Sequence, residues 1–567
     1  MTDATLPIGD DGFYHPGSEE DIIALVHKAA AEGLQIRARG AAHSNAPGIY
    51  TDPGPDAAPV PNKVSIQKPP PGPHLNLMFD RYRTLRWIDK EQGIVEAEAG
   101  LHLGGDPYDP TKTSTLENSL LYQAWQAGWT LRGLGGITHQ TVGGFLSTGS
   151  SGGSLRYSID ENLLAFRLID AQGHARWIER HQDQDLFAAV GVSMGLLGLL
   201  SKVRLQLTPA YHIYGQETTT PTILEDCPID LFGPGQGGKP SLQAFLEQVP
   251  YTRLLWWPQP GVQRVAIWQA IAAEPVPAFV PIPYRELKAN PDLEQLAGAF
   301  FYTLIGNLDN LSQVPRKLEA DYDQFARAMD MVLERMGLGD VFRDVLARVV
   351  AGVVEGAGDT LAWLLQPFAA LLKQELPHYL PRVIDLFQPL TEKGKSTAFR
   401  DYAWRSLPMD NAADDILLGT EFTEVWVPLS KALEVMQALK QHFDTGGLNA
   451  TGYYAIELHA APASDFWLSP SYKEPVLRID VFWFSKNAGN PAARDGFYAQ
   501  FWRLLRPFGF RLHWGKFLPE YDYAEWAQYF RAQLPRLQDF LALREQMDPQ
   551  GLFLTHYWKR HLYGVVE

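Results

Sequence analysis

The chain has 567 residues, of which 46% are hydrophobic and 20% charged, and its formal net charge at pH 7 is −16. This length exceeds what one hydrophobic core supports, so two or more domains are expected. The acidic balance argues against a nucleic-acid partner, because phosphate backbones attract basic surfaces.

The cysteine content and the apolar runs predict the cellular compartment of the protein. Cys227 is the one cysteine, which excludes an intramolecular disulfide and fits a reducing compartment. Residues 1–16 are polar and acidic, without the features of a secretory signal or a transit peptide. No uncharged apolar run reaches the length of a membrane span. We therefore expect a cytoplasmic protein without a transmembrane segment.

Short helices and strands alternate over the first 209 residues. A Ser-Glu-Glu-Asp sequence at 18–21 precedes apolar residues at helical spacing, which predicts a capped helix that ends near Gly33. Strands are expected at 34–39, 75–77, 85–89, 94–100, 164–170, 175–178 and 203–207, and helices at 119–127 and 185–190. The Pro- and Gly-rich segment 53–73 is expected to form an irregular surface insertion. Residues 1–209 are thus predicted to form one α+β domain.

A glycine-rich stretch at 133–154 holds eight glycines among 22 residues, with Ser and Thr between them. Such a backbone can approach a ligand closely, and its free N–H groups can form anion-binding nests. A phosphate-bearing cofactor is the expected ligand, and a flexible surface loop is the alternative. Neither the dinucleotide nor the P-loop fingerprint is present as written. A second turn of small residues, 40–44, follows the first predicted strand.

The rest of the chain has a different character. Aromatic-rich strands are expected at 254–258, 265–268, 422–427, 453–458 and 476–484, and helices at 430–443 and 495–505. This content suits a sheet with one face covered by helices. Between the two sets of strands, residues 292–380 form a helical block with a wide apolar stripe. That stripe is expected to be a core or subunit-contact face, which would allow a homo-oligomer, and an apolar substrate entrance or a membrane-surface contact is the alternative.

The first domain resembles the FAD-binding domain of the vanillyl-alcohol oxidase superfamily, also called the p-cresol methylhydroxylase type. The matching segments are 16–20, 37–44, 140–144, 147–149 and 195–207. The later block resembles the substrate (cap) domain of the aldonolactone and alditol oxidase branch, most clearly at His513-Trp514-Gly515-Lys516. The resemblance implies an α+β, two-domain flavoprotein. Its FAD-binding domain would span 1–209, and its cap of antiparallel sheet and helices 210–540, with the insertion 292–380. Residues 541–567 would return to the FAD domain.

The resemblance also implies the cofactor, FAD, with its diphosphate held by the two small-residue loops, and no metal is expected. The cofactor-binding residues that it implies are Arg39, Gly40, Ala41, Ala42, His43, Ser44, Gly136, Thr141, Gly143, Gly144, Thr148, Gly149, Ser150, Val203 and His513. In many relatives the histidine at the position of His43 bonds to the flavin 8α-methyl group, so a covalent link is expected. The alternative is a histidine that only hydrogen-bonds near the cofactor. Relatives of the sugar-oxidase branch carry Thr-His-Gly where this chain has Ser-Ser-Gly at 150–152.

The implied reaction is oxidation of an alcohol (CH–OH) group of a polyol, sugar lactone or other hydroxylated small molecule. A hydride would pass to flavin N5, and molecular oxygen would be the acceptor and give hydrogen peroxide. The resemblance assigns Glu457 to the substrate hydroxyl, Asp480 to a polar substrate contact, and Lys516 to the negative charge that develops on the flavin.

His459 stands two residues after Glu457, where relatives carry arginine, and the two side chains would share one strand face. It is either a base that relatives lack or a sign that the substrate has a different polar anchor. Structural roles are the alternatives: a salt bridge for Glu457, a buried hydrogen bond for His459, and an exposed edge for Asp480. Two other functions stay open, namely a dehydrogenase with a quinone or protein acceptor and a non-catalytic flavin-binding module.

Overall fold

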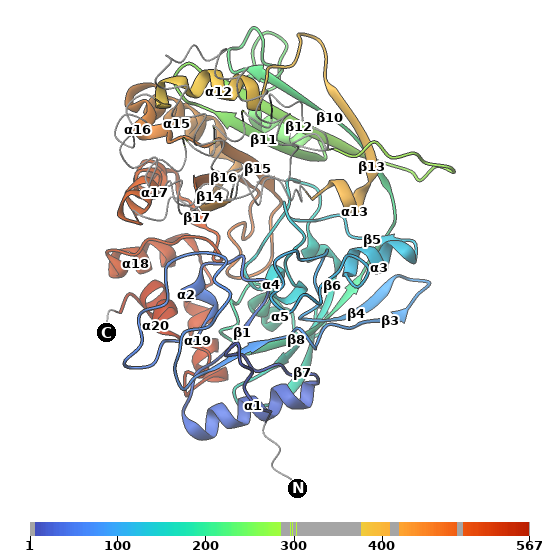
Figure 1. Cartoon of the computed structure of the whole chain (residues 1–567), viewed down its shortest axis with the longest axis vertical. Helices are drawn as coiled ribbons and strands as arrows, with labels where there is room; N and C mark the ends of the chain where they lie inside the picture. The colour runs from blue at the N-terminus through green and yellow to red at the C-terminus, as the bar shows by residue number, and fades with distance from the viewer. Residues whose placement is uncertain are drawn as a thin grey trace, which may run out of the picture.

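The computed structural model describes residues 6–284, 376–408, 419–484 and 491–565, together with positions 295, 298, 302 and 305. Most of the helical insertion expected at 292–380 therefore lies outside the described residues. Figure 1 shows two stacked parts, of which the lower holds both the N-terminal segment and the C-terminal helices. In the part of the chain that the structure describes, no helix combines the length and the hydropathy needed to cross a bilayer.

The first helix, α1 (Glu19–Glu32), is capped as its sequence predicts. The Ser18 hydroxyl accepts from the Asp21 amide at 3.1 Å, and the Asp21 carboxylate accepts from the Ser18 amide at 3.1 Å. Gly33 ends the helix with φ at +64°, a left-handed conformation that glycine adopts without a steric penalty. The helix buries its predicted apolar face, which consists of Ile22, Leu25, Val26 and Ala29.

The lower part contains two sheets and a short antiparallel pair of strands, β5 (Trp129–Thr130) with β9 (Thr208–Pro209). Strand β1 (Ile36–Arg39) pairs in parallel with β2 (Leu75–Met78). A five-stranded antiparallel sheet has the order β3-β4-β8-β6-β7. Its strands are β3 (Leu85–Asp89), β4 (Ile94–Glu98), β6 (Leu163–Ile169), β7 (Ala175–Glu179) and β8 (Leu199–Gln206). The hairpin expected over 164–178 is confirmed as β6 and β7, and segment 53–73 has no helix or strand, as expected.

Short elements connect these strands. The connecting elements are α2 (Ala46–Ile49), α3 (Leu120–Gln126), β5 (Trp129–Thr130), α4 (Val142–Ser147), a 3-10 turn (Ile159–Asn162), α5 (Gln184–Val190) and β9 (Thr208–Pro209). The middle of the glycine-rich stretch is therefore a short helix, α4, and turns and irregular backbone lie on either side.

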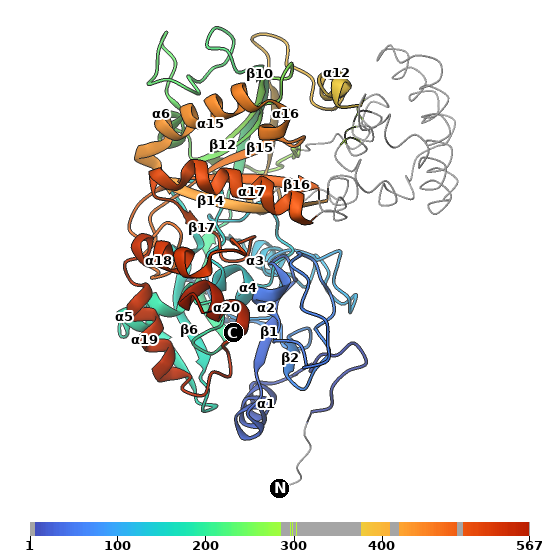
Figure 2. The same cartoon turned by 90° about the vertical axis from the view of Figure 1, so that its left-hand side faces the viewer.

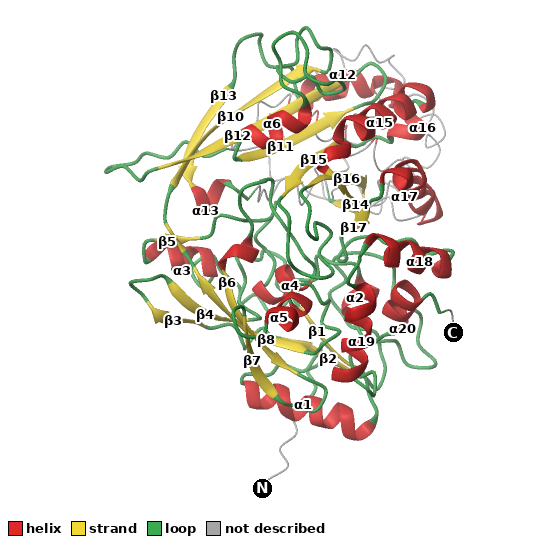
Figure 3. Ribbon diagram, turned by 180° about the vertical axis from the view of Figure 1, so that it is seen from behind, coloured by secondary structure: helices red, strands yellow, loops and turns green. Residues whose placement is uncertain are grey.

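The upper part is built on an eight-stranded sheet with the order β13-β10-β12-β11-β15-β16-β14-β17, in which all neighbours run antiparallel. Its strands are β10 (His212–Pro221), β11 (Tyr251–Trp257), β12 (Arg264–Ala273), β13 (Thr397–Tyr402), β14 (Thr420–Pro428), β15 (Ile456–Ala461), β16 (Val476–Phe484) and β17 (Arg511–Leu512). Figure 3 shows this sheet in yellow above the smaller one.

Helices cover this upper sheet on one face, as the resemblance implies. Figure 2 shows α6 (Leu242–Gln248), α15 (Ala432–Gly446), α16 (Leu448–Thr451) and α17 (Pro491–Leu505) together on that face. Two shorter helices, α12 (Leu380–Phe387) and α13 (Ala403–Ser406), flank the sheet. Buried apolar side chains from both parts belong to one continuous cluster, which includes Val203 of β8 and Leu458 of β15. A shared core of this kind fixes the position of the upper sheet over the lower part.

The last part of the chain returns to the lower part. It forms α18 (Tyr523–Gln533), α19 (Leu537–Met547), α20 (His556–Trp558) and a π-helical turn (Lys559–Tyr563). The Ile36 amide donates to the Leu552 carbonyl at 2.8 Å, and the Trp558 indole donates to the Gly48 carbonyl at 3.0 Å. Figures 1 and 3 place α18 and α19 beside the lower part, so the return begins before residue 541.

Candidate active site

A cavity of about 1060 Å³, including its open mouth, lies where the two parts meet. Four segments far apart in sequence supply most of its wall, namely 37–44, 140–150, 194–200 and 513–516. The first three belong to the lower part, and the fourth follows β17 of the upper sheet. Ligand sites commonly lie in such spaces between two parts of a protein.

The two small-residue segments contact each other through their backbones. A Cβ added to Gly40 would lie 2.5 Å from the Thr141 hydroxyl, and a Cβ added to Gly143 would lie 2.9 Å from Cβ of Ala99. Thr141 caps α4, because its hydroxyl accepts from the Gly144 amide at 3.2 Å. Gly143 and Gly144 both lie in the first turn of α4. Their lack of a side chain serves close packing in the cavity wall.

Most of the residues implied as FAD ligands line this cavity. They are Arg39, Gly40, Ala41, Ala42, His43, Ser44, Thr141, Gly143, Gly144, Thr148, Ser150 and His513. Three others do not. Val203 is fully buried in β8, Gly136 lines a different cavity, and Gly149 faces Val192 and Pro470 at the end of α4. The role of the lining residues toward FAD stays a prediction.

Arg37 is a wall residue to which the sequence analysis gave no role. Its buried guanidinium donates to the carbonyls of Gly48 at 2.8 Å, Met194 at 2.7 Å and Phe553 at 3.2 Å, and so ties together three segments around the cavity. Burial lowers the pKa of Arg37 to about 10. The sequence could have indicated this position, because Arg37 precedes Arg39 by two residues on a strand, and residues i and i+2 point to the same face.

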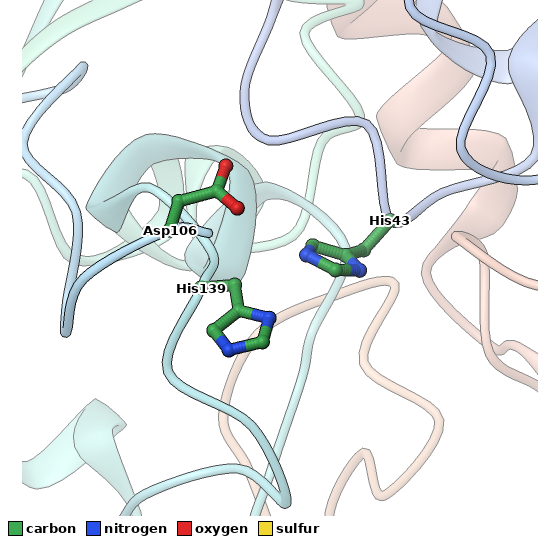
Figure 4. A group of neighbouring side chains, drawn as sticks. All are labelled: His43, Asp106 and His139. Atoms are coloured by element: carbon green, nitrogen blue, oxygen red, sulfur yellow. The ribbon is translucent and has the colours of Figure 1, made fainter. Parts of the chain in front are cut away.

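His43 lies in the turn after β1, at the cavity wall. Figure 4 shows its imidazole pointing toward Asp106 and His139, and one ligand atom from each of the three residues lies within 4.8 Å of the others. Burial lowers the pKa of His43 to about 3, and His139 adds to this effect while Asp106 opposes it. The imidazole is therefore neutral at pH 7 and keeps a free lone pair. Two imidazoles and a carboxylate are also a donor set that divalent metal ions accept.

Strand β15 presents Glu457 and His459 side by side, as the i, i+2 spacing predicts. Nε2 of His459 lies 3.0 Å from Oε1 of Glu457, and the same oxygen accepts from Nε of Arg253 on β11. Burial alone would raise the pKa of Glu457, but Arg253 and His459 hold it well below its usual range. The salt-bridge alternative for Glu457 is therefore present in the structure. Arg253, a lone arginine in an apolar strand, was missed by the sequence analysis.

Asp480 faces Glu457 across the strand pair β15–β16. The alternative of an exposed edge position is excluded, because Asp480 lies on a central strand and is 3% exposed. Its Oδ1 has no hydrogen-bond partner among the described residues. Burial, together with the negative charges of Glu424 and Glu457, raises the pKa of Asp480 well above its usual range. A neutral carboxylic acid can donate a hydrogen bond as well as accept one.

Lys516 connects this cluster with the cavity. Its Nζ lies 4.0 Å from the centroid of the Phe422 ring, and its pKa is lowered by burial, while Glu424 and Asp480 oppose the shift. Lys516 lines the cavity, whereas Glu457, His459 and Asp480 do not. Asp480 and Glu457 lie close enough to Lys516 to act on its pKa, but only the lysine lines the cavity, so the convergence of Glu457, His459 and Lys516 on a flavin ring stays a prediction.

Arg478 and Glu424, also missed from the sequence, form an ion pair at 2.7 Å between β16 and β14. Burial would raise the pKa of Glu424, but Arg478 and His513 lower it to about 2. The same guanidinium donates to the Ser151 carbonyl at 2.7 Å, which anchors loop 150–154 to the upper sheet. Ser150 also contacts His513, with 3.3 Å between Oγ and Nε2.

A second cavity of about 430 Å³ lies on the other side of this loop. Segments 133–136 and 152–154 form one wall, and Tyr251, Arg253 and His459 contribute to the wall from the upper sheet. Because Ser150 lines the first cavity and Gly152 the second, one short loop separates a cofactor-sized space from a space for a smaller molecule.

The residues of the first cavity fit FAD. The backbone cradle at Gly40 and Gly143 is one that any Cβ would obstruct, and the hydroxyls of Ser44 and Thr148 with the guanidinium of Arg39 are suitable donors to a diphosphate. Nε2 of His43 is buried and has no hydrogen-bond partner among the described residues. An unpaired buried nitrogen is uncommon, which fits a histidine whose polar contacts change when a cofactor binds beside it.

Comparison with known proteins gave consistent matches. The D-arabinono-1,4-lactone oxidase family model matches residues 402–561. The chain is 19% identical over 555 residues to L-gulonolactone oxidase of Scyliorhinus torazame, covering 97% of this chain and 95% of that protein. It is 20% identical over 478 residues to L-gulonolactone oxidase of Mus musculus, covering 84% and 82%. A solvent-stable cholesterol oxidase superposes with a TM-score of 0.60 at 14% identity, over 97% of this chain and 94% of that one. At this identity the structural likeness shows the fold alone.

Proposed function

We propose that the chain is an FAD-dependent oxidase of the aldonolactone oxidase branch of the vanillyl-alcohol oxidase superfamily, which its matched family model and its relatives support. It would act on the CH–OH group of a polyol, sugar lactone or other hydroxylated small molecule, with molecular oxygen as the acceptor. The observation that carries the proposal is the position of Lys516. This residue lines the large cavity, and the nearby buried carboxyl groups of the upper sheet act on its pKa.

When bound, FAD would supply a two-electron acceptor for the hydride at its N5. Lys516 would stabilise the negative charge that develops on the reduced isoalloxazine, because a preorganised cation in a partly dry site acts strongly. Its buried position supports this role, since screening by solvent is weak there.

The substrate proton would go to His459. Its Nε2 is held by Glu457, as in other carboxylate–histidine pairs, which fixes the tautomer and leaves Nδ1 as the basic nitrogen. Nδ1 has no hydrogen-bond partner among the described residues, and the second cavity is lined by His459. Arg253 would replace the arginine that relatives carry two residues after the glutamate. Asp480, whose burial favours the protonated form, would donate a hydrogen bond to the substrate oxygen.

FAD would be linked covalently through His43. The neutral imidazole at the cavity wall supports this, because a bond to the flavin needs an available lone pair. We also place the protein in the cytoplasm, which the single Cys227 supports. Self-association through residues 292–380 stays a prediction.

Three measurements on the purified protein test the proposal. An absorption spectrum should show bound flavin, and fluorescence of the denatured band should show that the flavin stays attached. An oxygen electrode with a panel of polyols and aldonolactones should then detect oxygen uptake, with hydrogen peroxide formed in equal amount. Reduction of dyes without oxygen uptake would favour a dehydrogenase. A colourless protein that does not take up FAD would overturn the proposal.

A further inference from the structure

Asp106 is a buried carboxylate beside the large cavity that the proposed reaction does not use. Its side chain is 1% exposed and lies in the cluster with His43 and His139 (Figure 4). Oδ1 accepts from the Tyr108 amide at 2.9 Å, and Oδ2 lies 3.5 Å from Nε2 of His102. A buried carboxylate is costly to keep unless its charge has a partner or a task.

Asp106 is an anion in a group of basic side chains. Burial would raise its pKa, but His102 and the Tyr108 amide hold it below the usual range. The surroundings of His43 disfavour a positive charge on its ring, through burial and the nearby His139, Lys516 and His102. Asp106 acts in the opposite direction and favours that charge. Asp106 is therefore placed to stabilise His43 when that ring becomes charged.

The covalent link is the event that would charge His43. One bond forms between a ring nitrogen and the flavin C8α carbon, and one methyl C–H bond breaks. The methyl proton leaves, and the electron pair of that bond passes through the isoalloxazine to oxygen. With that proton and one from water, the oxygen becomes hydrogen peroxide. The neutral imidazole that gives its lone pair to carbon becomes a cation, while its other nitrogen keeps its proton.

We propose that Asp106 is a positioning residue for this link: its carboxylate accepts a hydrogen bond from Nε2–H of His43, directs Nδ1 to the flavin, and neutralises the imidazolium that forms. The buried Nε2, which lacks a partner among the described residues, is the atom that this contact would satisfy. His139, the other imidazole of the cluster, has its ring centroid 5.5 Å from that of His43 and would take up the methyl proton. The inference rests on the proposed covalent attachment through His43.

A merely structural role for Asp106 can be separated from this one. Asp106→Asn keeps the shape and the oxygen that accepts from the Tyr108 amide, but removes the charge. Asp106→Glu restores the charge. Asp109→Asn is the matched control, because Asp109 is a second buried carboxylate in the same loop and accepts from the amides of Thr111, Thr113 and Ser114.

The experiment follows the link itself. Apoprotein prepared with EDTA, which excludes a metal at the cluster, is incubated with FAD and oxygen but no alcohol. Acid-stable flavin and hydrogen peroxide are measured with time. Wild type and Asp109→Asn should form acid-stable flavin with one peroxide per link. Asp106→Asn should bind the same total flavin but form the covalent link at about one tenth of the wild-type rate or slower. A loss of this size is expected when one charge-assisted hydrogen bond is removed. Asp106→Glu should recover part of the rate.

Linking of Asp106→Asn at the wild-type rate would overturn the proposal. An equal loss in Asp109→Asn would assign the effect to the fold of the loop and would also overturn it. A wild-type protein that releases all of its flavin in acid would refute the covalent link and this inference together. Oxygen uptake with alcohols by that same protein would leave the oxidase function intact.

Discussion

The large cavity has two kinds of wall, and they are built on different principles. The lower wall consists of short segments of small residues, in which Gly40, Thr141 and Gly143 bring backbones into contact. The wall toward the upper sheet is backed by charged side chains from separate strands, paired as Arg253–Glu457 and Arg478–Glu424. The first surface shapes a space for a cofactor, and the second sets an electric field beside it.

This difference predicts different responses to mutation. A backbone wall tolerates no added volume, so a change there should remove the cofactor. A charged wall can change sign or proton affinity without losing its shape, so a change there should alter the rate and its pH dependence. The four predictions below compare the two walls and begin with the largest effect.

Gly143→Val is expected to give apoprotein. Its Cβ would lie 2.9 Å from Cβ of Ala99 and 3.1 Å from the Ala99 carbonyl oxygen, so α4 would have to move at the cavity wall. The ratio of flavin absorbance to protein absorbance measures this. Gly496→Ala is the control, because that exposed glycine on α17 has no atom within 4 Å of an added Cβ. Normal flavin content in Gly143→Val would mean that this wall does not position the cofactor.

Lys516→Met should lower turnover by about 10²–10³-fold, the usual cost of losing one preorganised electrostatic partner. Flavin content should stay near wild type, since methionine keeps the length of the side chain and its contact with Phe422. Oxygen-electrode rates under saturating substrate, normalised to bound flavin, provide the measurement. If kcat is unchanged, Lys516 does not face the developing charge.

Arg253→Met should destabilise the protein by about 3–5 kcal/mol, because it leaves the buried carboxylate of Glu457 with His459 as its remaining partner among the described residues. The melting temperature of the holoprotein should fall, and Arg253→Lys, which keeps the charge, should lose less. The direction of the pH dependence follows from the depressed pKa of Glu457 in the folded protein. The ion pair stabilises the fold at pH values above the pKa that Glu457 has in the unfolded chain, and this stabilisation is lost as the pH falls toward the folded-state pKa. The deficit of Arg253→Met should therefore be largest near neutral pH. An equal deficit at every pH would contradict this account.

His459→Arg is expected to have the smallest effect on stability and a specific effect on the rate profile. If His459 is the base, its protonation creates the low-pH limb of turnover, and arginine, which does not titrate in this range, should abolish that limb. The maximum rate should also fall. A profile of unchanged shape would make His459 a packing and hydrogen-bonding residue of β15.

Features that depend on neighbouring residues were predicted from the sequence. The capping box that starts α1, the hairpin of β6 and β7, and the shared face of Glu457 and His459 all follow from spacing along one segment. The small-residue loops were recognised for the same reason, because glycine and serine at fixed offsets limit the backbone wherever they occur.

Tertiary structure alone decided which distant side chains meet. Arg253 reaches Glu457 because β11 and β15 are neighbours in the upper sheet, and sequence separation gives no measure of that pairing. The burial of Asp480 and the contact of Asp106 with His43 likewise depend on which elements cover them. Charge and proton affinity in a protein depend on burial and on nearby charges, and both are properties of the assembled fold. The sequence by itself therefore determined the local elements and the types of residue available, and the packing of strands and loops decided which of them form a site.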